Sequence, residues 1–331
     1  GIRGVIWYQG ERIEVESSWG SSASAIADNK GRWKCFLDTP RHGVGHLLTI
    51  RGDTDTMTIR NVAIGEVWLC VGQSTMGWSV GNSFEAEQEA EVDLKDYRIF
   101  KSAREHWHLP LEMPRDRLSR WKRCDPESAA ETSAVAYYFG KKLHQELDVP
   151  VGIIQQAYAG TPIEGWMPWE FQKDVSSAVT HKASLDYRAG KTGSRDQAFA
   201  QFDRELADYN AKIEAGETMK NSVKALTPPI ITKPADLGHQ YPAHQFNAMI
   251  HPVRPYGIRG VIWYQGERNS KDVPQAAATV GTWGCFVTTV RRGTTRRVEV
   301  LQMISLSSSL NCRAGIHHRP NRSKAWKLPG R

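Results

Sequence analysis

The sequence predicts an α/β fold, in which a parallel sheet with flanking helices follows a small, truncated β domain. Three apolar runs carry this prediction, at residues 67–71, at 151–154 and at 261–264 within the segment 257–267. Each run is apolar at successive positions, as in a strand that is covered on both faces, and each ends in small or polar residues. Because open α/β sheets place reactive groups at the carboxyl ends of their strands, the three runs predict one site at one sheet edge.

Ser74 follows the first run and is the candidate nucleophile. Residues 65–78 read Gly-Glu-Val-Trp-Leu-Cys-Val-Gly-Gln-Ser-Thr-Met-Gly-Trp. Gly72 permits a sharp turn, so Ser74 is expected just beyond the end of the strand. Most serines in turns only hydrogen-bond local backbone, and this segment by itself leaves that alternative open.

The second and third runs end in residues that can stabilise negative charge. Ala157, Ala159 and Gly160 are small, and Thr161-Pro162 fits the start of a helix, so the Gly160 N–H is a candidate oxyanion donor. The alternative is a tight strand-to-helix connection. After the third run, Gln265 is a candidate amide donor, and Glu267 either orients a neighbour or hydrogen-bonds backbone.

The segments around these runs predict further elements. Alternation at 13–16 and apolar stretches at 33–37 and 46–50 predict strands of the β domain, with a turn at 28–31. Asp125 is a plausible N-cap for a helix that runs through Leu147, with Pro126 in its first turn. Its expected buried stripe consists of Val135, Tyr138, Phe139, Leu143 and Leu147.

Composition favours a soluble globular protein. The 331 residues are 40% hydrophobic, which is ample material for two domains. We find no run near the ~20 apolar residues that a membrane helix needs. The five cysteines lack Cys-x-x-Cys spacing, so a zinc site is not expected.

The polar segments between the runs have two interpretations each. The Arg/Lys/Trp-rich stretch 115–123 either contacts an acidic sugar carboxylate or is a solvated loop. His106 and His108 either line the cleft or are ordinary loop histidines. Residues 171–220 are polar and are expected to form a helical excursion over the site edge.

At the candidate site the sequence resembles the sialate O-acetylesterase family, within the larger group of SGNH-type esterases and lipases. The family's serine block is similar to 65–78, usually with Asn where Thr75 stands. Its glycine block is similar to 159–164, usually with Gly where Ala159 stands.

Three more segments follow the family's order. The family's third block is similar to 263–267, usually followed by Ser where Arg268 stands. Segments 125–147 and 246–252 also resemble family segments, and the resemblance covers roughly residues 10–275. It implies an SGNH-type, flavodoxin-like sheet.

The resemblance also implies a reaction. Ser74 would attack an acetyl ester on a sugar, with O-acetylated sialic acid as the first candidate substrate and acetylated plant polysaccharide as the second. The oxyanion would be held by the N–H groups of Ser74 and Gly160 and by the Gln265 amide, with Gln73 and Glu267 in support. No metal or organic cofactor is implied, and the expected partner is a small molecule or glycan that carries O-acetyl groups, with no membrane partner.

The family's catalytic base is where this sequence departs from the pattern. A serine needs such a base, which the family supplies as the histidine of an Asp-x-x-His block near the C-terminus. The only Asp-x-x-His in this chain is Asp236–His239, which precedes the third block. His317 and His318 come late enough, but neither has an aspartate three residues before it. The alternative function is therefore a catalytically impaired, sugar-binding relative.

Both ends of the chain are atypical. Residues 1–12 repeat identically at 257–268, so 1–12 is interpreted as an aberrant duplicated segment. It precedes a partial β-sandwich at 13–63 and an SGNH-like esterase domain at 64–275. No start methionine or signal peptide is recognisable, and the cellular location is left unassigned.

The remaining segment, 276–331, is expected to be a disordered or out-of-frame tail. From 269 onward the chain has 11 Lys and Arg against two Asp and Glu. Such a segment can hardly bury enough apolar area to offset its ordering entropy. A natural basic arm for nucleic acid is the alternative, although no recognition motif supports it.

Overall fold

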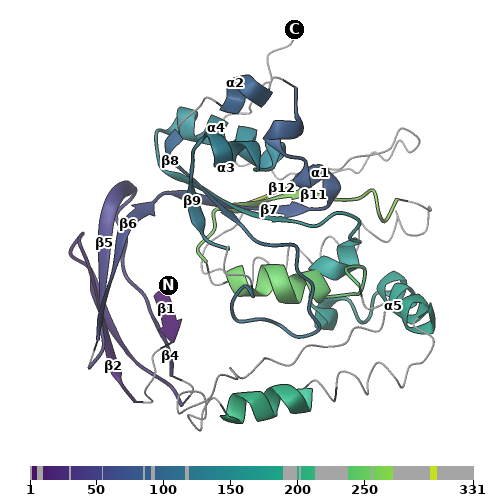
Figure 1. The fold of residues 1–331 in the computed structure, drawn as a ribbon, viewed down its shortest axis with the longest axis horizontal. Helices are drawn as coiled ribbons and strands as arrows, with labels where there is room; N and C mark the ends of the chain where they lie inside the picture. Colours follow the sequence, from purple (N-terminus) through teal and green to yellow (C-terminus); the bar gives the residue numbers. More distant parts are fainter. Residues whose placement is uncertain are drawn as a thin grey trace, which may run out of the picture.

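The computed structural model describes residues 2–5, 10–29, 31–53, 55–84, 86–90, 94–115, 119–188, 200, 203–212, 238–254, 256–270 and 299–303. An N-terminal β layer lies beside a larger unit, in which helices cover both faces of a central sheet (Figure 1). This is the predicted class, an α/β fold that follows a small β domain.

The β layer is a four-stranded antiparallel sheet in the order β3-β2-β5-β6. Alternate residues of its strands are buried together with residues of β4, and this core includes Ile13, Val15, Trp33 and Ile50. The predicted strands are present, and β1 pairs with β4 beside this sheet. Their bounds are β1 (Ile2–Val5), β2 (Arg12–Ser17), β3 (Ser22–Ile26), β4 (Arg32–Cys35), β5 (Gly43–Arg51) and β6 (Thr56–Ile64).

The central sheet has six strands in the order β12-β11-β7-β10-β8-β9. All neighbours pair in parallel except β8 and β9, which are antiparallel. The three predicted apolar runs are β7, β10 and β11, adjacent in the middle of the sheet. The bounds are β7 (Glu66–Gly72), β8 (Leu94–Lys101), β9 (Trp121–Cys124), β10 (Val151–Ala157), β11 (Gly260–Tyr264) and β12 (Glu299–Met303).

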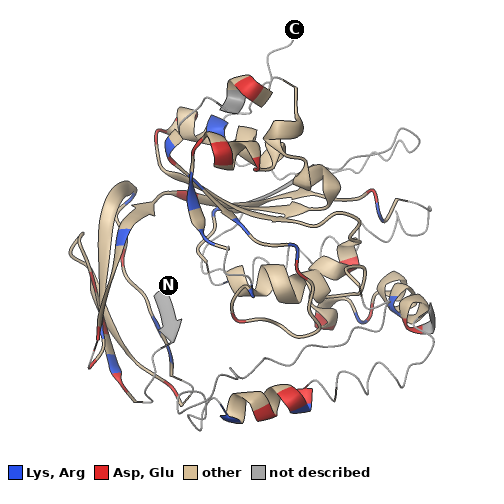
Figure 2. Ribbon diagram, in the orientation of Figure 1, with Lys and Arg blue, Asp and Glu red and all other residues tan. Residues whose placement is uncertain are grey.

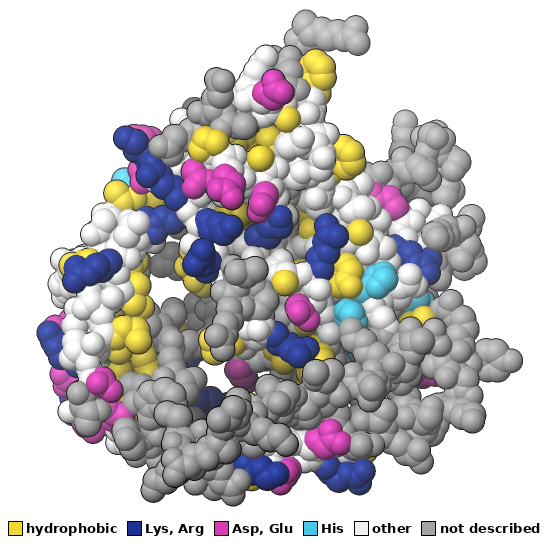
Figure 3. Space-filling view, in the orientation of Figure 1, with side chains coloured by type: hydrophobic (Ala, Val, Ile, Leu, Met, Phe, Trp, Pro, Cys, Tyr) yellow, Lys and Arg dark blue, Asp and Glu magenta, His cyan; other side chains and the backbone are white. Residues whose placement is uncertain are grey.

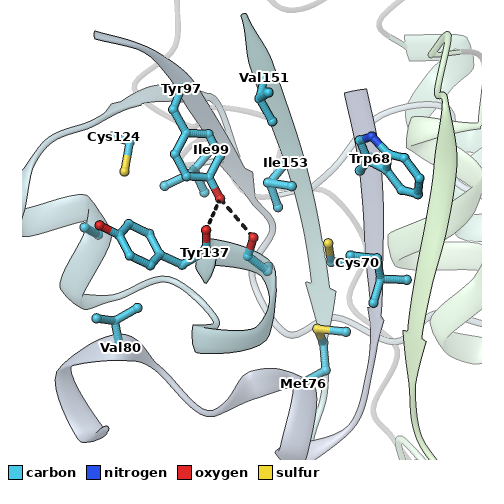
Figure 4. Close-up of a cluster of buried hydrophobic side chains, with 13 residues drawn as sticks. Trp68, Cys70, Met76, Val80, Tyr97, Ile99, Cys124, Tyr137, Val151 and Ile153 are labelled. Carbon is cyan, nitrogen blue, oxygen red and sulfur yellow. Dashed lines mark hydrogen bonds between the residues drawn. The ribbon is translucent and has the colours of Figure 1, made fainter. Parts of the chain in front are cut away.

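One face of this sheet packs against helices α1, α3 and α4. The apolar cluster on this face joins Cys70 and Ile153 of the strands to Met76 and Tyr137 of the helices (Figure 4). The Tyr97 hydroxyl donates to the main-chain oxygens of Ala136 (3.0 Å) and Tyr137 (3.3 Å), which ties α4 to β8. The bounds on this side are α1 (Ser74–Gly77), η1 (Val80–Asn82), α2 (Ala86–Ala90), α3 (Pro126–Ala130) and α4 (Ala134–Leu147).

The other face is covered by short helices, whose apolar cluster includes Trp166, Phe246 and Trp263. These are η2 (Ile163–Trp166), η3 (Trp169–Phe171), the π-helix η4 (Phe246–Ile250) and η5 (His251–Val253), with α5 (Ser176–Arg188) beyond them. Residue 200, 203–212 and α5 fall within the expected helical excursion, much of which lies outside the described residues.

The predicted helix from Asp125 to Leu147 is two helices. Asp125 caps α3 as expected, because its carboxylate accepts the Ser128 N–H at 2.8 Å. Ser133 then caps a second helix by accepting the Ala136 N–H, which breaks the run. The predicted stripe was wrong in part, since Tyr138 and Leu147 are exposed. The buried residues of α4 are Ala136, Tyr137 and Gly140.

The basic segment 276–331 contributes one strand. Its residues Glu299–Met303 form β12, which pairs with β11 at the edge of the sheet. These five residues therefore differ from the expected disorder, because a short apolar run extends an exposed sheet edge through main-chain hydrogen bonds. The rest of the segment lies outside the described residues, and the division at 275 stays a prediction.

Within the described ranges, no helix is both long and apolar enough to cross a bilayer. The cysteines Cys35, Cys70 and Cys124 are buried free thiols.

Candidate active site

Ser74 is the first residue of α1 and is exposed at the carboxyl edge of the sheet. Gly72 ends β7 level with Ala157 of β10 and Tyr264 of β11, so three strand ends meet beneath the serine. Among the described residues, the Ser74 hydroxyl has no hydrogen-bond partner. The serine is thus accessible to a substrate, and its hydroxyl does not hydrogen-bond the described backbone of the turn.

Gln265 lies beneath the turn and is buried. Its Nε2 donates to Asn269 Oδ1 at 2.8 Å and to the Thr161 carbonyl at 3.2 Å. The Ile163 N–H also donates to Asn269 Oδ1, at 2.9 Å, and this bond identifies the acceptor end of the Asn269 amide. Both amide hydrogens of Gln265 therefore face inward, which differs from the predicted donation to an oxyanion.

Gln73 connects this buried network to the serine. Its side-chain oxygen accepts the Arg268 N–H at 3.3 Å and faces Gln265 Nε2 at 3.4 Å. These contacts join the turn after β7 to the turn after β11, and the supporting role of Gln73 stays a prediction.

Asn269 was missed by the sequence reasoning. It is 3% exposed, and its Nδ2 donates to Glu164 Oε2 at 2.9 Å. Its side chain thus holds the turn after β10 against the turn after β11. The only sequence signal was its place two residues after the third family-like block.

Replacing Asn269 with Ala is expected to destabilise the fold by about 3 kcal/mol. The change leaves the Ile163 N–H, the Gln265 amide and the Glu164 carboxylate without this partner, and each unsatisfied buried group costs about 1–3 kcal/mol. Urea unfolding would measure the loss. Ser270→Ala is the control, since Ser270 is exposed, and equal stability of the two variants would contradict this account.

Gly160 lies in the turn after β10 with a φ of +75°, a conformation that favours glycine. A Cβ at this position would lie 3.2 Å from the Nε2 of His239. The predicted oxyanion residue and His239, the histidine of the one Asp-x-x-His motif, are therefore neighbours. The Tyr158 N–H donates to the Gly72 carbonyl at 3.0 Å, which fixes this turn beside the end of β7.

The His239 ring stacks on Tyr158, with 5.0 Å between centroids and 17° between planes. Burial lowers the pKa of His239, and the positive charge of Arg268 lowers it further. The neutral ring, which can accept a proton, is thus favoured near neutral pH. Its predicted partner Asp236 lies outside the described residues, and within them no histidine hydrogen-bonds to Ser74.

Replacing Arg268 with Gln is expected to raise the pKa of His239. Removing the cation takes away an interaction that disfavours the imidazolium form, so protonation becomes easier. An NMR titration of the His239 ring would measure the shift. The control is Arg12→Gln in β2, and an unchanged His239 pKa in the Arg268 variant would show that the ring does not sense this charge.

Glu267 has a different environment from the one predicted. Both of its carboxylate oxygens are buried and have no hydrogen-bond partner among the described residues. It therefore neither orients a described neighbour nor bonds backbone through its side chain.

The two loop histidines, His106 and His108, have different surroundings. The His106 ring lies 6.0 Å from that of Tyr158 and stacks with His244, so it belongs to the aromatic group beside His239. His108 instead lies 3.3 Å from Asp203, and burial lowers its pKa although Asp203 acts in the opposite direction. His317 and His318 lie outside the described residues.

Comparison with known proteins relates the chain to acetylesterases. No protein-family model matches it. It is 27% identical over 264 residues to sialate O-acetylesterase from Mus musculus, covering 75% of this chain and 44% of the relative. It is 25% identical over 308 residues to sialate O-acetylesterase from Homo sapiens, covering 87% of this chain and 49% of that relative. The chain thus spans about half the length of the curated relatives that it matches.

A solved structure supports the fold. The structure matches that of a carbohydrate acetylesterase from Xanthomonas citri with a TM-score of 0.65 and 24% identity, covering 88% of this chain and 52% of the other. Three of the family-like segments, 65–78, 159–164 and 263–267, include the turns that meet at the carboxyl edge of the sheet. The chain is thus similar in sequence to sialate O-acetylesterases and in fold to a carbohydrate acetylesterase.

Proposed function

We propose that this chain is a carbohydrate O-acetylesterase with Ser74 as its nucleophile. The observation that carries the proposal is the exposed Ser74 hydroxyl, which has no hydrogen-bond partner in the described part of the chain and lies where β7, β10 and β11 end. The similarity to sialate O-acetylesterases makes O-acetylated sialic acid the first candidate substrate. Acetylated plant polysaccharide is the second.

In the proposed reaction, Ser74 Oγ attacks the acetyl carbonyl while its proton passes to a base. The N–H groups of Ser74 and Gly160 stabilise the oxyanion. The Ser74 N–H suits this role because the first N–H groups of a helix have no acceptor within the helix. The sugar leaves as an alcohol that takes back the proton. Water, activated by the same base, then hydrolyses the acetyl-enzyme and releases acetate.

Two sources of the base are compatible with the site. His239 lies beside Gly160 and has a lowered pKa, as a neutral acceptor requires. The other source is a histidine outside the described residues. Gln265 and Asn269 do not contact the substrate in this proposal. They position the turns around Ser74 through their buried hydrogen bonds.

The second candidate function is sugar binding without turnover. It is favoured by the lack of a hydrogen bond between any described histidine and Ser74. Loss of a triad member lowers turnover by orders of magnitude and leaves an oxyanion hole in place.

Acetate release from O-acetylated sialic acid and from acetylated xylan fragments would test the proposal. Samples quenched in acid and digested would also show which peptide carries an acetyl group during turnover. Acetate release with an acetyl group on Ser74 is the expected result. No acetate from either substrate would reject the esterase and leave the sugar-binding alternative.

A further inference from the structure

A basic pocket of about 210 Å³ lies between β8, β9 and α3. Its lining includes three basic side chains and three hydroxyl side chains, and Glu131 is the one acidic residue on it. The pocket is smaller than the roughly 300 Å³ of sites that enclose a whole drug-sized ligand. It therefore suits one group of a larger molecule. The basic and hydroxyl residues are Lys101, Arg120, Lys122, Ser102, Ser128 and Thr132.

The charges of this pocket favour an anion. Lys101 donates from Nζ to the Glu131 main-chain oxygen at 2.9 Å. Burial lowers the pKa of Lys101, and the charges of Arg104 and Lys122 lower it further, while Glu131 acts in the opposite direction. Figures 2 and 3 show Lys and Arg on β9 and across this face of the molecule. A bound anion would relieve this repulsion.

A hydroxyl donor is also available. Ser102 Oγ accepts a hydrogen bond from Gln156 Nε2 at 2.9 Å. The hydroxyl proton of Ser102 has no acceptor among the described residues. Charged donors beside a hydroxyl donor match the two oxygens of a carboxylate.

The pocket and Ser74 share one edge and one face of the sheet. Lys101 and Cys70 both pair with Gln155, so β8 ends at the level of Cys70, two residues before β7 ends at Gly72. The two strands are separated by β10 alone, a spacing of about 10 Å. On the helical side, the Ser133 hydroxyl lies 3.4 Å from the sulfur of Met76 in α1. The segment after α3, which lines the pocket, thus contacts the helix that carries Ser74.

We propose that this pocket binds the carboxylate of an acidic sugar whose acetyl ester is presented to Ser74. Lys122 and Arg120 pair with the carboxylate, and Ser102 donates its hydroxyl proton to it. The inference rests on the proposed function, and it assigns the stretch around 120–123 to substrate selection. Figure 3 shows histidine side chains further along the same face, beyond the basic group.

Calorimetric binding of N-acetylneuraminic acid and of its neutral carboxamide would test the pocket without any turnover. The test variant is Arg120→Gln with Lys122→Gln. The matched control is Lys95→Gln with Lys142→Gln, which removes two charges from exposed positions away from the pocket. Because a charged hydrogen bond contributes about 1.5–3 kcal/mol, the test variant is expected to weaken binding of the acid about tenfold or more.

The control variant is expected to bind the acid like the wild type, and the carboxamide is expected to bind the wild type at least about tenfold more weakly than the acid. Three results would overturn the proposed carboxylate pocket. They are equal binding of acid and carboxamide by the wild type, equal binding of the acid by the two double variants, and no binding of the acid at millimolar concentration. Selective binding without acetate release would reject the esterase and keep the pocket. Acetate release from neutral sugars without selective binding of the acid would keep the esterase and reject the carboxylate pocket.

Discussion

Replacing Ser74 with Ala is expected to lower kcat for acetate release by about 10⁴-fold or more. The alanine removes the atom that forms the acetyl-enzyme, and loss of a serine nucleophile typically leaves only the residual catalysis of the oxyanion hole and of binding. The KM is expected to change little, because Ser74 is exposed and makes no described hydrogen bond that positions other residues. Steady-state kinetics on O-acetylated sialic acid would measure both quantities.

Ser79→Ala is the matched control for this variant. Ser79 follows α1 closely, and its hydroxyl only accepts from the exposed Asn82 amide at 2.8 Å. Ser79 is half-buried, and its replacement is expected to keep kcat within about twofold, because the change removes a single hydrogen bond to an exposed amide. Equal activity of Ser74→Ala and the wild type would mean that the reaction uses another nucleophile.

Replacing Gly72 with Ala is expected to destabilise the protein by more than about 4 kcal/mol, or to prevent folding. A Cβ at this position would overlap the main-chain oxygen of Tyr264 and lie 2.8 Å from the Cβ of Met76. The first neighbour belongs to a buried central strand and cannot rotate away, so β7 and β11 would have to separate. Urea unfolding followed by circular dichroism would measure the effect.

Gly257→Ala is the control for the glycine variant, because a Cβ at Gly257 meets no atom within 4 Å. That variant is expected to remain within about 0.5 kcal/mol of the wild type. If Gly72→Ala unfolded at the same urea concentration, the close approach of β7 and β11 would not exist in solution.

The three apolar strands were predictable because their signal is local. Continuous apolar residues that end in glycine or polar residues identify a strand covered on both faces, whatever its partners are. Ser74 could be placed at the sheet edge for the same reason. The N-cap at Asp125 was also readable, since its carboxylate and Ser128 lie only three residues apart.

Contacts between distant segments were not predictable in this way. The inward direction of the Gln265 amide depends on Thr161 and Asn269, and the position of His239 depends on the turn after β10. Strand β12 likewise acquires its role from the free edge of β11. No pattern within one segment reports such partners.

The duplicated 12 residues show the difference between what a local sequence determines and what its distant neighbours decide. In the first copy, Gly4 pairs with Trp33 in an antiparallel ladder. In the second, the identical Gly260 pairs in parallel with Trp68. The sequence by itself determined that the second copy contains a strand and that Ser74 closely follows another strand. Only the tertiary structure decided which strands pair and which side chains meet, because hydrogen-bond partners and burial depend on neighbours far along the chain.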